Sequence, residues 1–118
     1  MNTLSIGILH PGEMGISVAA TLQNSGHVVY WASDGRGPQT RARAARHGLR
    51  DAGTLTDLCT RCPVIVSVCP PDAAETVAAA VLACGFHGLY LDANAISPQR
   101  AERMAALAAG KPLLPFID

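Results

Sequence analysis

The chain has 118 residues, 49% of them hydrophobic, and its nine basic and nine acidic side chains cancel. This length fits one domain with a real core and leaves little room for a second. The balanced charge offers no footprint for nucleic acid or an anionic membrane, and no apolar run approaches the roughly 20 residues that span a bilayer. We therefore expect one domain of a cytoplasmic protein, with neither nucleic acid nor membrane as a partner.

The first motif lies in residues 4–15 (LSIGILHPGEMG), where an apolar run breaks into a Pro/Gly turn and then opens a small-residue helix. A strand that turns tightly into a helix leaves unpaired N–H groups and the positive end of the helix dipole at one point, which suits a phosphate. In the dinucleotide pattern G-x-G-x-x-G, Gly12 and Gly15 fill the second and third places and His10 takes the first. We interpret this turn as a pyrophosphate cradle; a strand, turn and helix without a ligand is the alternative.

The helix after this turn is predicted over residues 13–25, with Gly26 as its stop. Gly12 would let the main chain approach a ligand, and Gly15 would let the helix lie close to the strand. Apolar residues at four-residue spacing predict one buried face. They are Met14, Val18 and Leu22, with Ala19 and Ala20 beside them.

Strand and helix signals alternate through the middle of the chain. β-branched and aromatic residues predict a strand over residues 28–33, and Pro38 begins a helix that stops at Gly48. A short strand is predicted near residues 49–52. The arginines of the helix are interpreted as a solvated face: Arg41, Arg43 and Arg46.

The same alternation continues to the end of the chain. A brief helix has a capping-box start at Thr54 and Asp57, and a near-continuous apolar strand is predicted over residues 64–68. The next helix is predicted to start at Asp72, because Glu75 follows three residues later. Its small-residue stripe is expected to pack on the sheet: Ala73, Val77, Ala80, Val81 and Cys84. The last predicted elements are a strand over residues 88–93, a helix from Ser97 and Pro98 to Gly110, and a strand over residues 113–117.

This alternation with short connections implies a parallel sheet with right-handed crossovers and helices on both faces. We therefore predict an α/β fold, a Rossmann-type doubly wound parallel sheet in three αβα layers. Ligands of such sheets bind beyond the carboxyl ends of the strands. Unusual polar, Pro and Gly residues gather at the four expected strand ends, residues 9–12, 33–36, 69–72 and 94–97.

The chain has four cysteines, Cys59, Cys62, Cys69 and Cys84. Cys59 and Cys62 form a C-x-x-C, but no second closely spaced Cys or His pair completes the four ligands of a zinc site. We expect no metal site and interpret the cysteines as reduced thiols, with Cys69 and Cys84 behaving as small buried hydrophobes.

Four segments, IGILHPGEMG, GHVVYWASDGR, VIVSVCPPDAAETV and LYLDANAISP, resemble the amino-terminal domain of the β-hydroxyacid dehydrogenase family, above all its 6-phosphogluconate-dehydrogenase-like NAD-binding branch. The resemblance covers essentially the whole chain in order and spacing. It implies a nicotinamide dinucleotide held along one edge of the sheet. The implied contacts are the backbone of His10, Pro11, Gly12, Glu13 and Met14; Ser33, Asp34 and Arg36 at the adenosine ribose; Cys69, Pro70 and Pro71 along the dinucleotide; and Asn94 and Ala95 near the nicotinamide.

The chain departs from the family pattern at three places. His10 replaces a glycine, so that either the turn is looser or the imidazole has a role. Ser33 and Asp34 stand where many members have Asn-Arg, and Asn94 and Ala95 stand where the family commonly has Ser-Thr. The substrate is therefore expected to differ from the familiar hydroxyacids.

The choice of cofactor depends on three residues after the second predicted strand. A carboxylate such as Asp34 would accept hydrogen bonds from the ribose hydroxyls of NAD, whereas a hydroxyl with an arginine, Ser33 with Arg36, would favour NADP. Because the strand is predicted to end at Ser33, we expect Ser33 to occupy the discriminating place and NADP to be preferred over NAD.

The resemblance implies reversible hydride transfer between the nicotinamide and a small hydroxyacid, carbonyl or imine. In that family a lysine of a second, helical domain acts in proton transfer, and this chain stops at Asp118. Its only lysine, Lys111, is predicted at the opposite edge of the sheet. We therefore expect residues 1–118 to be the cofactor half of an oxidoreductase, without catalytic residues and inactive alone, whose missing half makes most contacts of a homodimer. A non-catalytic NAD(P)-sensing module and an imine or ketopantoate reductase are the alternatives.

Overall fold

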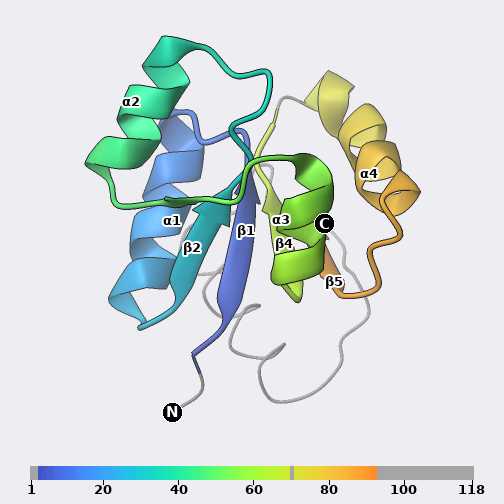
Figure 1. The fold of residues 1–118 in the computed structure, drawn as a ribbon, viewed down its shortest axis with the longest axis horizontal. Helices are drawn as coiled ribbons and strands as arrows, with labels where there is room; N and C mark the ends of the chain where they lie inside the picture. The colour runs from blue at the N-terminus through green and yellow to red at the C-terminus, as the bar shows by residue number, and fades with distance from the viewer. Residues whose placement is uncertain (1–2, 70, 93–118) are drawn as a thin grey trace.

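The structure is a computed structural model that describes residues 3–69 and 71–92. Strands and helices alternate along these residues (Figure 1). In chain order they are β1 (Ser5–Leu9), α1 (Glu13–Asn24), β2 (Val28–Trp31), α2 (Pro38–Arg46), β3 (Arg50–Asp51), α3 (Leu55–Arg61), β4 (Val64–Ser67), the 3-10 helix η1 (Pro71–Ala73), α4 (Ala74–Ala83) and β5 (Leu89–Asp92). The elements predicted over residues 97–110 and 113–117 lie outside the described residues.

The five strands form one parallel sheet in the order β3-β2-β1-β4-β5. The chain moves outward from β1 to β3, crosses back to β4 and then moves outward to β5. The direction reverses between β1 and β4, which is the switch point where ligands of doubly wound sheets bind. The predicted Rossmann-type fold is therefore confirmed.

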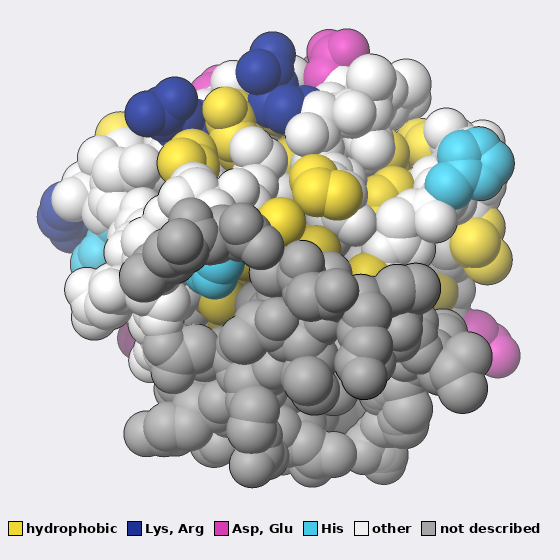
Figure 2. Space-filling model, turned by 90° about the horizontal axis from the view of Figure 1, so that it is seen from below, with side chains coloured by type: hydrophobic (Ala, Val, Ile, Leu, Met, Phe, Trp, Pro, Cys, Tyr) yellow, Lys and Arg dark blue, Asp and Glu magenta, His cyan; other side chains and the backbone are white. Residues whose placement is uncertain are grey.

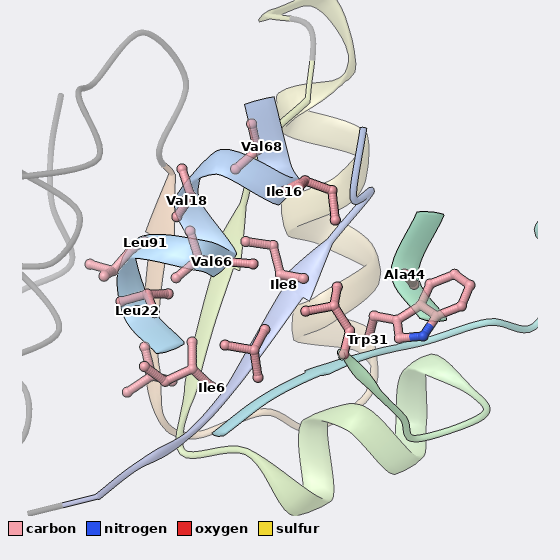
Figure 3. Packing of buried hydrophobic residues seen from close by; sticks show 14 residues of the cluster. Ile6, Ile8, Ile16, Val18, Leu22, Trp31, Ala44, Val66, Val68 and Leu91 are labelled. Carbon is pink, nitrogen blue, oxygen red and sulfur yellow. The ribbon is translucent and has the colours of Figure 1, made fainter. Parts of the chain in front are cut away.

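Helices cover both faces of the sheet because successive strand residues point to opposite sides. On β1, Ile6 and Ile8 face the layer of α1 and α2, where they pack with Leu22 and Trp31 (Figure 3). Leu9 faces the layer of α3 and α4 and joins a second apolar cluster. The two clusters confirm the three predicted layers.

Gly7 brings α3 close to the sheet. A Cβ atom at this position would lie 2.7 Å from Cδ1 of Ile65 and 2.9 Å from Cγ of Leu58. Only glycine leaves room for Leu58, which is fully buried on α3, to lie directly over the centre of β1. This requirement is not visible in the pattern of the sequence.

The buried face of α1 differs from the predicted stripe. Val18, Ala19 and Leu22 are buried as expected, but Met14 is 54% exposed and Ile16 is buried instead. The helix contacts the strand through Gly15, and Met14 lies about 100° around the helix axis from that contact. Its place in the first turn therefore directs its side chain to solvent.

The two predicted helix starts in the second half have different outcomes. The Thr54 side chain accepts a hydrogen bond of 3.1 Å from the N–H of Asp57, which confirms the cap of α3. Asp72 does not cap α4, because η1 precedes that helix and Ala73 is its N-cap residue.

On α4, Val81 is buried but Ala80 is exposed, so the small-residue stripe packs only in part. Among the described helices, none is long and apolar enough to cross a membrane.

Candidate functional site

The turn between β1 and α1 lies at the switch point of the sheet. His10 has a φ of 60°, in the left-handed region that favours glycine. Its carbonyl accepts a hydrogen bond of 2.7 Å from the N–H of Gly12, which closes the turn over the buried Pro11. His10 thus adopts a conformation that glycine reaches freely, and the turn keeps its tight shape at a cost of about 1 kcal/mol.

The amino terminus of α1 is open for a ligand. Gly12 is its N-cap residue, and no side chain of the described residues caps the helix there. The first-turn N–H groups of Glu13, Met14 and Gly15 have no acceptor within an α-helix. Among the described residues, a Cβ atom at Gly12 would meet nothing within 4 Å, whereas one at Gly15 would lie 2.9 Å from the carbonyl oxygen of His10. Close packing at Gly15 is as predicted, and the space at Gly12 leaves room for the main chain to approach a ligand there.

A pocket of about 250 Å³ adjoins this turn. It lies beyond the carboxyl ends of β1 and β2, between the second turn and the helices α3 and α4. Its lining residues are Ile8, Leu9, His10, Ala32, Asp34, Arg36, Leu55, Thr76, Val77 and Ala80. The pocket has an apolar floor with a carboxylate, a guanidinium and an imidazole at its rim. This composition suits a flat heterocycle joined to a polar sugar.

In the second turn, between β2 and α2, one residue is buried in the fold and two others line the pocket. Ser33 is only 6% exposed and does not line the pocket, while Asp34 and Arg36 do. The Ser33 hydroxyl and N–H hydrogen-bond with the carboxylate of Asp51. Strand β2 ends at Trp31, two residues before the predicted end, and the Asp34 N–H beyond it donates to the Gly53 carbonyl at 2.9 Å. The structure therefore offers Asp34 and Arg36 to the pocket in place of Ser33.

Asp51 holds this second turn electrostatically. Partial burial raises the pKa of Asp51, but hydrogen bonds from Ser33 and from the Gly53 N–H, with the nearby charge of Arg41, outweigh it and lower the pKa. The Gly53 N–H donates to Oδ1 of Asp51 at 2.8 Å. The charged form of Asp51 is thus the form that the turn requires.

Two arginines of α2 bind carbonyls of the turns at the site. Arg41 is exposed, as predicted, whereas Arg43 is half-buried. Arg41 donates from Nη2 to the Ser33 carbonyl at 3.0 Å and from Nε to the Arg36 carbonyl at 3.2 Å. Arg43 donates from Nη1 to the Pro11 carbonyl at 3.5 Å. Arg46 remains exposed, as predicted. Helix α2 therefore links the first turn to the second.

The imidazole of His10 lies half-buried at the rim of the pocket. Burial lowers the pKa of His10, and the positive charge of Arg36 lowers it further. His10 is therefore neutral at pH 7, and Arg36 is the cation that this rim presents to a ligand. The sequence left open whether His10 has a role; the structure directs its side chain to the pocket.

The third predicted segment contributes less to the pocket than expected. Cys69 is half-buried, its Sγ lies 3.5 Å from Oγ of Ser67, and it does not line the pocket. Pro71 begins η1. Pro70, Asn94, Ala95 and Lys111 lie outside the described residues. In place of this segment, α3 and α4 supply pocket residues that sequence reasoning missed; the small residues of α4 were the available signal, but they were assigned to packing alone.

None of the four cysteines forms a disulfide, in agreement with the predicted reduced thiols. Within residues 3–69 and 71–92, no group of three or more His, Cys, Asp or Glu side chains could hold a metal ion. Cys69 and Cys84, which were predicted to be buried, are half-buried, whereas Cys59 and Cys62 are buried. Cys59 lies within α3, and Cys62 and Cys84 are the C-cap residues of α3 and α4. The surface at the other end of the sheet from the pocket, seen from below the view of Figure 1, shows small apolar areas and scattered Arg and His side chains among its described residues (Figure 2).

No family model and no curated protein matches this chain. Solved structures do. A conserved protein of unknown function with structural similarity to 3-hydroxyacid dehydrogenases is 32% identical, with a TM-score of 0.65 over 90% of this chain and 40% of that one. The 3-hydroxyisobutyrate dehydrogenase of Mycobacterium tuberculosis, solved with L-serine, is 25% identical, with a TM-score of 0.67 over 97% and 39%. An imine reductase variant from Myxococcus stipitatus in complex with NAD⁺ shares the fold at 18% identity, with a TM-score of 0.63 over 92% and 38%.

This chain thus spans about two fifths of the length of these neighbours. The structural matches agree with the resemblance that the four sequence segments carry. By sequence pattern and by structure, the chain is a β-hydroxyacid dehydrogenase-like amino-terminal domain of the Rossmann type.

Proposed function

We propose that this chain binds a nicotinamide dinucleotide across the switch point of the sheet. The pyrophosphate would lie over Gly12, where the uncapped N–H groups of α1 face open space. The adenosine would enter the adjoining pocket. The observation that carries this proposal is the juxtaposition of an open helix amino terminus with a pocket whose rim holds Asp34 and Arg36.

We propose further that NADP is preferred over NAD. Arg36 supports this preference because its guanidinium stands at the pocket rim and can bind a 2′-phosphate through two hydrogen bonds. Asp34 acts in the other direction, since its carboxylate would repel that phosphate and accept from ribose hydroxyls. The preference therefore depends on Arg36, while the buried Ser33 supports the turn from behind.

The complete protein would be an oxidoreductase that transfers hydride between the nicotinamide and a small hydroxyacid, carbonyl or imine. We propose that residues 1–118 form the dinucleotide-binding domain of a cytoplasmic enzyme, and that a helical domain supplies catalysis and most contacts of a homodimer. The full-length neighbours support this division, because each is more than twice as long as its match to this chain. This domain alone is expected to show no turnover with any alcohol or imine.

Calorimetric titration of the purified chain with NADPH and with NADH tests two points separately: whether a dinucleotide binds, and which of the two binds more tightly. We expect both to bind, NADPH more tightly. Replacing Arg36 with Ala should weaken NADPH about tenfold, equivalent to about 1.4 kcal/mol, and leave NADH nearly unchanged. Arg46→Ala is the matched control, because Arg46 is exposed on α2 and does not line the pocket.

Absence of binding by both dinucleotides would refute the proposed site. Tighter binding of NADH would refute only the preference for NADP. The alternative of a non-catalytic sensing module shares the cradle and makes the same binding prediction. Sequencing the gene beyond Asp118 distinguishes the enzyme from the sensing module. A long helical extension favours the enzyme, and a stop or a DNA-binding segment favours the sensor.

A further inference from the structure

Helices α3 and α4 bring together two cysteines that are distant in sequence. Cys59 lies within α3, and Cys84 is the C-cap residue of α4. Thr56 lies three residues before Cys59 and therefore on the same face of α3. Its Oγ1 is 3.6 Å from Sγ of Cys84. The Cys84 thiol thus lies against the face of α3 that carries Cys59.

The two thiols differ in exposure. Cys59 is 9% exposed and belongs to the apolar cluster between α3, α4 and the sheet, whereas Cys84 is half-buried. Both line one open pocket of about 530 Å³, which also includes Cys62, Arg61 and His87. A small reagent in this pocket can therefore reach the Cys84 sulfur, and Cys59, which interacts with Cys84, lines the same pocket.

We propose that Cys59 and Cys84 form a reversible disulfide that joins α3 to α4. Cys62 is the weaker candidate for a partner: it is almost fully buried, and it follows Cys59 on the same chain segment, so that a bond between them would link no two elements. The inference is independent of dinucleotide binding.

The chemistry is thiol–disulfide exchange with a small-molecule disulfide such as oxidised glutathione. The Cys84 thiolate attacks one sulfur of the reagent, its S–S bond breaks, and one glutathione thiol leaves with the proton that Cys84 has lost. Cys59, as its thiolate, then attacks the Cys84 sulfur, and the second glutathione thiol leaves with the Cys59 proton. The protein loses two electrons and two protons, and the reagent gains both.

The environment of Cys59 makes ring closure slow at neutral pH. Burial raises the pKa of Cys59 to about 11, and the charge and hydrogen bond of Cys84 contribute to this shift. The other titratable groups at this pocket are Cys62, Arg61 and His87. Because the thiolate is the nucleophile, disulfide formation should become faster between pH 7 and pH 10.

The test exploits the spacing of basic residues. Trypsin cleaves after Arg61, which separates Cys59 from the other cysteines because the next basic residue is Arg100. The full chain is incubated with oxidised glutathione and digested without reduction. We expect the Cys59 peptide to be linked to the peptide of residues 62–100, and the link to disappear on addition of dithiothreitol.

Variants then identify the partner of Cys59. The link should be lost in Cys84→Ser and in Cys84→Ala, and should persist in Cys62→Ala and Cys69→Ser. Circular dichroism confirms that each variant is folded, and the two replacements at the half-buried position 84 guard against a fold defect in either one. As a second readout, closing a loop of about 25 residues should raise the Tm of the oxidised chain above that of the reduced chain.

Three results would overturn the inference. The first is a Cys59 link that survives in both Cys84 variants and is lost in Cys62→Ala. The second is a link that forms only in urea, since the native packing would then prevent it. The third is glutathione that stays attached to Cys84 in the folded chain at pH 10, without ring closure.

Discussion

The two turns at the carboxyl edge of the sheet are built by different physical means. Backbone groups build the first turn, where a left-handed residue, two glycines and a helix amino terminus leave N–H groups exposed. Side chains build the second turn, where Arg41 binds the Ser33 carbonyl and Asp51 binds the Ser33 hydroxyl and N–H. The comparison indicates that the phosphate end of the proposed site depends on local conformation, and the adenosine end on contacts between distant segments.

The largest effects are expected at the glycines of the first turn, where Gly15→Ala should lower stability and Gly12→Ala should lower dinucleotide affinity. Gly15→Ala places a Cβ atom 2.9 Å from the His10 carbonyl, so we expect it to lower the free energy of unfolding by about 1–3 kcal/mol. Gly12→Ala meets no atom of residues 3–69 and 71–92 within 4 Å and should leave stability within about 0.5 kcal/mol. Chemical denaturation measures both values.

For dinucleotide affinity, the larger direct effect is expected from Gly12→Ala, the variant that keeps its stability. Gly12→Ala places its methyl group in the proposed path of the pyrophosphate, so NADPH affinity should fall at least tenfold, or about 1.4 kcal/mol, in a stable protein. If Gly12→Ala binds NADPH as the unchanged chain does, the pyrophosphate does not lie over this turn.

A smaller effect is expected from Arg41→Ala in the second turn. Loss of its two hydrogen bonds to the Ser33 and Arg36 carbonyls frees the loop that carries Asp34 and Arg36. NADPH affinity should fall about threefold to tenfold through ordering entropy, with no loss of the preference over NADH. Calorimetric titration beside Arg46→Ala checks this result, and a change in preference would instead indicate direct contact between Arg41 and the 2′-phosphate.

Asp51→Asn should weaken the same turn in a way that depends on pH. Because the pKa of Asp51 in the folded chain is below its ordinary value of 3.8, the carboxylate contributes stability above that value and loses it as the pH falls through the folded pKa. The variant should therefore be less stable at pH 7, and its difference from the unchanged chain should shrink below pH 4. A difference that is constant with pH would contradict the electrostatic role of Asp51.

His10→Gly should have the smallest effect on the first turn. Glycine removes the cost of the left-handed conformation, about 1 kcal/mol, but it also increases the entropy of the unfolded chain. We expect the Tm to change by only a few degrees and NADPH affinity to stay within about threefold. A much larger loss of affinity would show that the imidazole binds the dinucleotide directly.

The local conformation of the first turn followed the sequence closely. Gly12 and Gly15 were assigned their separate roles because a tight turn and a close helix contact each restrict the residue type at one position. Met14 was misplaced because hydrophobic spacing does not show where a helix touches its sheet. The end of β2 was predicted two residues late, since β3, the strand beside it, is only two residues long and composition does not show where such pairing stops.

The sequence by itself determined a doubly wound parallel sheet and a glycine turn opening a helix, because periodicity and backbone conformation are properties of neighbouring residues. Only the tertiary structure decided that Ser33 faces inward, that Arg41 and Arg43 bind carbonyls of the two turns, and that Cys84 lies against the Cys59 face of α3. The physical reason is that burial and hydrogen bonding depend on which distant segments meet, and these meetings exist only once the sheet has brought the strand ends together.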